Sequence, residues 1–172
     1  AVDEAGFIIR EASINKITPE WRLLVDQVIL AYQNYWHHAI HSIYIRGSVA
    51  VGKAISGVSD IDSFAVVNTD KSQLDDSWFD SFQEPLKFQY PFCTGVELKA
   101  LESDCLLNLN LDSYHNLRML LKTQAACVWG EDISLQFPPC KPDINAVSHA
   151  FDLEQDLQRV IIDLQQLDEP QS

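Results

Sequence analysis

The residues best suited to chemistry in this sequence are Asp60 and Asp62, at the start of an apolar run over residues 61–67. A run rich in β-branched and aromatic residues is typical of a strand, and strand residues two apart project to one face, about 7 Å apart along the strand. Like charges about 4 Å apart repel by roughly 4 kcal/mol at an effective dielectric near 20. Because no Lys or Arg lies between or beside the two aspartates, the expected counter-charge is Mg²⁺, which takes carboxylate oxygens and substrate phosphates.

A glycine–serine pair, Gly47-Ser48, precedes the aspartates, with eleven residues between Ser48 and Asp60. It follows a short run of strand formers over residues 43–46, and Ser48 is predicted to cap a short helix over residues 49–55. Glycine allows close approach of the backbone, and the amides that open a helix bind anions. Residues 42–68 thus predict a phosphate-binding turn beside a pair of metal-binding carboxylates.

This combination resembles the signature of the DNA polymerase β-like nucleotidyltransferase superfamily. In that pattern an apolar residue, Gly, then Gly or Ser, a spacer of similar length and Asp-apolar-Asp follow in this order, as in Gly47-Ser48 and Asp60-Ile61-Asp62. The resemblance implies an α/β (α+β) fold with a mixed, mostly antiparallel sheet flanked by helices. It also implies that Asp60 and Asp62 hold two Mg²⁺ ions and that an NTP, first of all ATP, is the co-substrate.

The resemblance also implies roles for residues around the turn. Gly47 and Ser48 would hold the β and γ phosphates of the NTP, and Arg46 and Lys53 would be further phosphate contacts. Ser59 would brace the aspartate loop.

Glu97 is the candidate third carboxylate, on a strand predicted over residues 95–100. Composition alone favours a surface position for it. The resemblance favours the site instead, because the family places an Asp or Glu on the next strand after the aspartate pair. Glu97 would then complete the metal site or act as the general base.

The acceptor of the nucleotide is the second question that the resemblance raises. Residues 129–132, Trp-Gly-Glu-Asp, are similar to a turn of bacterial small-molecule nucleotidyltransferases, and the acidity of the chain suits a cationic acceptor. We therefore expect AMP transfer from ATP to a hydroxyl of an aminoglycoside-like small molecule, with release of pyrophosphate. Asp132 is expected to have a structural role.

Two other functions fit the same fold. One is a minimal nucleotidyltransferase antitoxin that binds and AMPylates a helical toxin partner, although Val51-Gly52 stands where those proteins usually carry Arg-Gly. The other is a catalytically inactive binding module, which the presence of all three carboxylates disfavours.

The bulk composition narrows the partners. Twelve basic against 25 acidic residues give a net charge of −13, whereas nucleic-acid binders normally carry a basic face. No apolar run is long enough to span a membrane and no signal-peptide pattern opens the chain, so a cytoplasmic protein is expected. The four cysteines show no C-x-x-C pairing and are expected to be reduced thiols.

The elements around the site follow from apolar periodicity. We expect a nucleotidyltransferase catalytic domain over residues 1–137, a Pro-rich linker over 138–142, and a C-terminal helix with an acidic tail over 143–172 that would begin a helical domain. Within the first domain, we expect helices over residues 19–41, 74–85 and 114–126.

Histidines cluster near the end of the first expected helix, where His37 and His41 would lie one turn apart. No third ligand stands at the usual spacing, so we expect His37, His38 and His41 to solvate the helix end and not to bind a metal.

Overall fold

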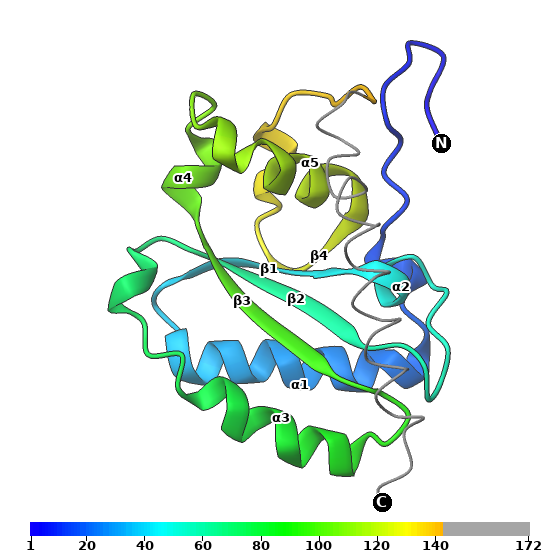
Figure 1. Cartoon of the computed structure of the whole chain (residues 1–172), viewed down its shortest axis with the longest axis vertical. Coiled ribbons are helices and arrows are strands. Elements are labelled where there is room, and N and C mark those ends of the chain that lie inside the picture. The colour runs from blue at the N-terminus through cyan, green and yellow to red at the C-terminus, as the bar shows by residue number, and fades with distance from the viewer. Residues whose placement is uncertain (143–172) are drawn as a thin grey trace, which may run out of the picture.

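The computed structural model describes residues 1–142 of the chain (Figure 1). The expected C-terminal helix over 143–172, and the helical domain it would begin, lie outside these residues. No helix in the described part of the chain has the length and apolar character needed to cross a membrane.

A four-stranded mixed sheet in the order β3-β2-β1-β4 forms the centre of the fold. The strand β1 lies antiparallel to β2 and to β4, whereas β3 lies parallel to β2. The α+β architecture with a mostly antiparallel sheet is therefore confirmed. The strands are β1 (Ile40–Arg46), β2 (Ile61–Val67), β3 (Val96–Glu102) and β4 (Ala125–Gly130).

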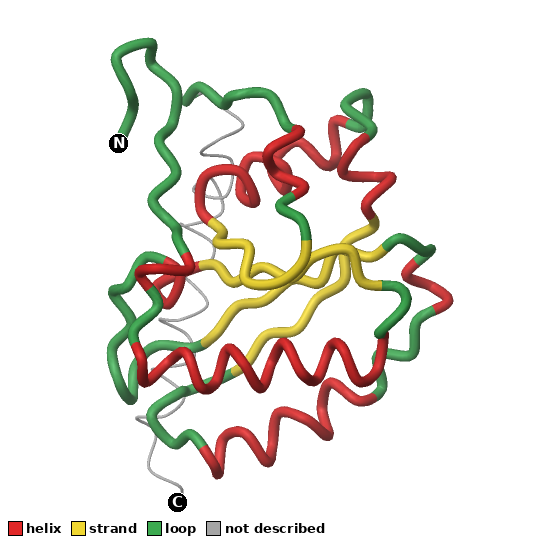
Figure 2. The backbone as a smooth tube through the Cα atoms, turned by 180° about the vertical axis from the view of Figure 1, so that it is seen from behind, coloured by secondary structure: helices red, strands yellow, loops and turns green. Residues whose placement is uncertain are grey.

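Helices cover both faces of this sheet (Figures 1 and 2). The two long helices α1 and α3 lie together on one face, and α4 and α5 lie on the other. Since β2 and β3 are parallel, the chain must cross over between them, and α3 provides this crossover. The helices are α1 (Pro19–Trp36), α2 (Gly47–Ala50), α3 (Trp78–Gln89), α4 (Ser103–Leu107) and α5 (His115–Gln124).

The core has two parts because strand residues alternate between the faces. Ile43 and Ile45 of β1 belong to the larger cluster with α1, while Tyr44 between them belongs to the smaller cluster with α5. The aromatic residues of α3 pack on those of α1: the Trp36 and Phe79 rings lie 5.3 Å apart, and Tyr35 stacks on Trp78 at 4.4 Å. The aromatic stripe of α3 is therefore largely core.

The first long helix ends earlier than predicted, at Trp36 and not near His41. The chain turns after Trp36, and His41 is already in β1, next to the fully buried Ser42. Pairing of β1 with two strands overrides the helical spacing of the apolar residues before it. The expectation that His37 and His41 share a helix turn is wrong, and the His41 Nδ1 lies 3.0 Å from the Ser42 Oγ instead.

The second long helix also differs from its prediction. It begins at Trp78 instead of Leu74 and continues past Pro85 to Gln89. Proline in a helix removes one backbone hydrogen bond and clashes with the preceding turn. Trp78 and Leu86, both about 4% exposed, anchor α3 in the core on either side of Pro85, so packing offsets this local cost.

Candidate active site

The candidate site is a row of three side chains across three neighbouring strands. Arg46 of β1 pairs with Asp62 of β2, and Asp62 pairs with Glu97 of β3. The Arg46 Nη2 lies 3.2 Å from the Asp62 Oδ1 and 3.6 Å from the Glu97 Oε2. Glu97 also accepts a 2.6 Å contact from the Nζ of Lys99, two residues along β3. The structure thus brings Asp62 and Glu97 together, with Arg46 and Lys99 as their cations.

The expectation that Mg²⁺ is the counter-charge of the aspartates is therefore incomplete. It considered sequence neighbours, but Arg46 reaches Asp62 across the antiparallel β1–β2 register, sixteen residues away in the chain. A signal was present in the sequence: Arg46 stands where the nucleotidyltransferase pattern has an apolar residue before the glycine. Arg46 is also placed beside the carboxylates instead of being a phosphate contact alone.

The pKa values of the two carboxyl groups, Asp62 and Glu97, are shifted in opposite directions. Burial raises the pKa of Asp62 to about 6; Arg46 opposes this shift, and Glu97 and Asp60 add to it. The hydrogen bond from Lys99 lowers the pKa of Glu97. Glu97 is therefore ionised throughout the neutral range, while burial disfavours the charged form of Asp62, which a further cation would stabilise.

Gly47 allows the turn to lie against the carboxylates. Its φ is +73°, a left-handed conformation that favours glycine. A Cβ at this position would lie 3.0 Å from the Asp62 Oδ2. The backbone approach that the sequence predicted for this glycine is thus made to the carboxylate itself.

The helix after this turn is shorter than predicted. It spans Gly47–Ala50, and Ser48 lies inside it instead of capping it. The chain turns at Gly52, whose φ is +72° and whose Cβ would lie 2.6 Å from the Lys16 backbone oxygen. A four-residue helix has almost no dipole, so phosphate binding here would rest on the amides of the turn.

Ser48 and Ser59 join the two ends of the loop between α2 and β2. The Ser48 hydroxyl donates to the Ser59 Oγ at 3.0 Å, and Ser59 accepts from the Ile55 N–H at 2.9 Å. Ser59 therefore braces the loop that carries Asp60, in the position that the sequence assigned to it. The exposed Lys53 forms no ion pair with the row of carboxylates within residues 1–142.

Asp60 lies at the margin of the site. It is exposed, directly precedes β2, and shares with Glu97 the lining of an open depression of about 420 Å³. Within residues 1–142 no three His, Cys, Asp or Glu side chains form a group that could hold a metal ion. Asp62 and Glu97 share Arg46 as a cation, whereas Asp60 acts on Asp62 through its charge.

The residues nevertheless fit a magnesium ion. Mg²⁺ in proteins is typically held by one or two carboxylates together with water and substrate phosphates. Asp62 and Glu97 offer hard oxygen donors on adjacent strands, and a cation beside them would stabilise the charged form of Asp62, which burial disfavours. A metal here would compete with Arg46 for both carboxylates.

A buried hydrogen-bond network holds the strand that carries Glu97. The Tyr32 hydroxyl of α1 accepts from the Lys99 N–H at 3.0 Å, donates to the Lys99 carbonyl at 3.2 Å, and lies 3.1 Å from the Ser63 Oγ. Ser63 in turn donates to the Glu97 carbonyl at 2.8 Å. Tyr32 and Ser63 are fully buried, so both backbone contacts lie in the core beneath the site. Sequence periodicity placed Tyr32 in the core but gave no sign of its partners.

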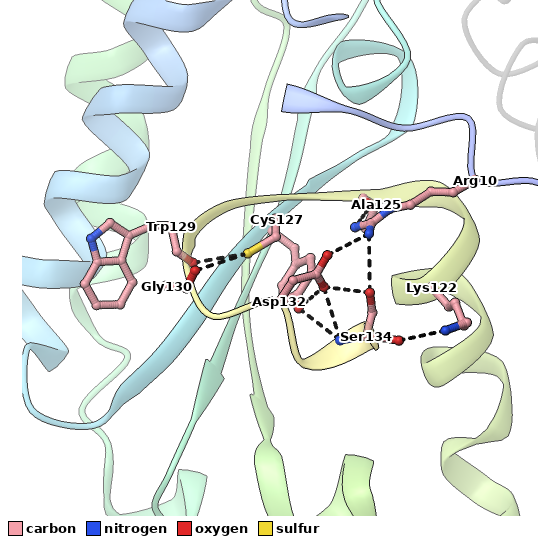
Figure 3. A network of polar contacts seen from close by, with 9 residues as sticks. Arg10, Lys122, Ala125, Cys127, Trp129, Gly130, Asp132 and Ser134 are labelled. Atoms are coloured by element: carbon pink, nitrogen blue, oxygen red, sulfur yellow. Dashed lines mark hydrogen bonds and ion pairs between the residues drawn. The ribbon is translucent and has the colours of Figure 1, made fainter. Parts of the chain in front are cut away.

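Asp132 has the structural role that the sequence predicted (Figure 3). It accepts from the Arg10 Nη1 at 2.7 Å, from the Tyr44 hydroxyl at 2.8 Å and from the Ser134 hydroxyl at 2.6 Å. Arg10 also donates to the Ala125 carbonyl, which ties the N-terminal arm to β4. Asp132 is therefore not part of the carboxylate row.

No protein-family model matches the chain, and no curated protein matches it. Among the solved structures that resemble it is a mutant of the toxin–antitoxin pair MntA-HpeT, with 20% identity, 82% of this chain and 97% of that chain covered, and a TM-score of 0.42. Another is a toxin–antitoxin structure with AMP-PNP, with 17% identity, 86% and 99% covered, and a TM-score of 0.42. Both are likenesses of overall shape at low identity.

Proposed function

We propose that this protein is a magnesium-dependent nucleotidyltransferase that moves a nucleoside monophosphate, AMP from ATP, onto an acceptor hydroxyl. The observation that supports it is the row of Asp62 and Glu97 on adjacent strands, with the glycine turn at Gly47 in contact with Asp62. The turn offers backbone amides to phosphates, and the carboxylates offer oxygens to the metal that accompanies them.

In the transfer, the acceptor hydroxyl gives its proton to solvent water and its oxygen bonds to the α-phosphorus of the NTP. The bond from that phosphorus to the bridging oxygen breaks, and pyrophosphate leaves with the electron pair. Mg²⁺ would polarise the phosphate and stabilise the leaving charge. Asp60 and Asp62 would hold the metal, and Gly47 and Ser48 would contact the phosphates. Because Lys99 lowers the pKa of Glu97, that carboxylate suits a metal ligand better than a general base.

Calorimetry with Mg²⁺ and the α,β-methylene analogue of ATP, whose α–β bond is not cleaved in the transfer, tests this assignment. We expect metal-dependent binding that is lost in the double variant Asp60→Ala with Asp62→Ala. Asp26→Asn is the matched control, since it removes a half-exposed carboxylate from α1 and should bind as the wild type does. Undiminished binding by the double variant would rule out the assigned site.

A protein acceptor is the second candidate, and the position of Glu97 favours it. Glu97 lies on β3, an outer strand of the sheet that residues 1–142 form, and its side chain is 39% exposed at an open depression. A hydroxyl on a partner's surface could reach such a site, as the antitoxin alternative requires.

Labelled ATP separates the acceptors. The protein is incubated with a panel of aminoglycosides and, separately, with small helical proteins that co-purify with it. Label on an aminoglycoside supports the small-molecule function expected from the sequence, and label on a protein band supports AMPylation of a partner. Nucleotide binding without labelling of any acceptor supports the inactive binding module.

A further inference from the structure

A cavity of about 890 Å³ lies beside the carboxylate row, along β3. Its size is that of a small-molecule pocket. Part of its wall is apolar and comes from the face of the sheet that carries the row and from α5. These residues are Phe64, Leu101, Leu117 and Leu120.

The charges that line this cavity differ from those of the whole chain. Three cations, Arg46, Lys71 and Lys99, face two carboxylates, Asp70 and Asp76. The chain as a whole has a net charge of −13. Arg46 and Lys99 are paired with Asp62 and Glu97, so a local surplus of positive charge exists once those two carboxylates are neutralised. Such a surplus suits an anion and opposes a polycation such as an aminoglycoside.

Arg46 has hydrogen-bonding capacity left for a ligand. It contacts the carboxylates through Nη2, and its guanidinium lies over the Phe64 ring at 5.8 Å. The Arg46 Nε is buried and has no hydrogen-bond partner. The Arg46 side chain as a whole is 32% exposed, so the accessible part of its guanidinium, and not the buried Nε, can donate to an anionic oxygen in the cavity.

Arg46 and Lys99 line the cavity and also neutralise the carboxylates. As long as no other cation binds Asp62 and Glu97, these carboxylates remain paired with the two cationic side chains. A divalent cation on the carboxylates would release both for a second anion. Because the metal binds the carboxylates and the anion binds the two cations that those carboxylates otherwise hold, the two ligands must be thermodynamically coupled.

We propose that this cavity binds the acceptor, a small molecule with a hydroxyl group, an apolar body and a carboxylate or phosphate group. Arg46 and Lys99 bind its anionic group once the charge of Asp62 and Glu97 is neutralised. This inference rests on the proposed function for the role of the ligand as acceptor, but the preference for anions does not depend on it.

Three probes with one apolar body test the preference: 4-hydroxyphenylacetate, its neutral amide, and the cation tyramine. Their dissociation constants are measured by NMR titration of the backbone amides, with Mg²⁺ present. Since charge-assisted hydrogen bonds are stronger than neutral ones, the anion should bind roughly 10-fold more tightly than the amide, and tyramine most weakly. Equal affinity for all three probes would overturn the proposal.

Arg46→Met and Lys99→Met test the assigned cations. Each should remove most of the anion's advantage over the amide while the amide binds as before. Arg22→Met is the matched control, because it removes an exposed positive charge of α1 that does not line the cavity. If Arg22→Met has the same effect, the preference comes from the overall charge and the site is wrong.

The double variant Asp62→Asn with Glu97→Gln separates this inference from the proposed function. It releases Arg46 and Lys99 without any metal, so it should bind the anion roughly 10-fold more tightly than the metal-free wild type. That result supports the cavity even if Mg²⁺ and nucleotide fail to bind. Unchanged affinity in the variant, with its fold verified by circular dichroism, contradicts the cavity even if nucleotide transfer is observed.

Discussion

Asp62 sets the electrostatics of the site, because it lies between the cation of β1 and the carboxylate of β3. Its pKa of about 6 in the folded protein is above the value of about 4 in an unfolded chain. Between these two values the folded state holds a proton that the unfolded state has lost. The contribution of Asp62 to stability should therefore fall as the pH rises from about 4 to about 6.

Asp62→Asn removes this titration. Relative to the wild type, the variant should gain about 1–3 kcal/mol in free energy of unfolding between pH 4.5 and pH 7. Urea denaturation at the two pH values measures the change, and Asp26→Asn controls for net charge. A difference between variant and wild type that is constant with pH would contradict the buried, raised carboxyl.

Gly47 is the second residue whose type matters. Gly47→Ala should lower the free energy of unfolding by about 1–2 kcal/mol, because a residue with a Cβ is strained at a φ of +73°. The new methyl would also press on the Asp62 Oδ2, so Mg²⁺ affinity should fall more than stability explains. Gly57→Ala is the control, since its φ is +76° but no atom lies within 4 Å of its Cβ. Equal loss of metal affinity in both variants would show that the contact with Asp62 is unimportant.

At the scale of elements, α1 holds β3 through the Tyr32 hydroxyl. Tyr32→Phe leaves the Lys99 N–H and carbonyl without this partner and should cost about 1–3 kcal/mol of stability. Hydrogen exchange at the Lys99 amide should accelerate more than at Ala65, in the middle of β2. Tyr35→Phe, which removes a hydroxyl from an exposed residue of the same helix, is the control. If the Lys99 amide exchanges no faster in Tyr32→Phe, the network does not fix β3.

The elements show what sequence could predict and what it could not. β2 has the predicted bounds because its strand-forming residues lie between the polar residues Asp60 and Asn68, and Glu97 is on a strand as expected. Helix ends were missed where packing overrides local signals, as at Pro85 within α3. The role of Arg46 was missed because strand register brings it to Asp62, and register cannot be obtained from the spacing along one segment.

At the scale of the whole molecule, the net charge of −13 opposes compactness. Salt screens such repulsion, with a Debye length that falls from about 30 Å at 0.01 M to about 10 Å at 0.1 M. The Tm should therefore rise by several degrees between these concentrations of NaCl, as measured by circular dichroism. KCl should give the same rise; an effect of one salt only would indicate a specific ion site, and a falling Tm would contradict net repulsion.

The parallel pairing of β2 and β3 has a consequence for the order in which the site assembles. Antiparallel β1 and β2 are joined by residues 47–60, whereas β3 reaches β2 only after the longer crossover through α3. Contacts that close shorter loops form at lower entropic cost. We therefore expect Asp62 to meet Arg46 during folding before Glu97 arrives. The positive charge of Arg46 would then reduce the repulsion between Asp62 and Glu97 when β3 arrives. The carboxylate row would therefore depend on Arg46 during folding, before any metal is bound.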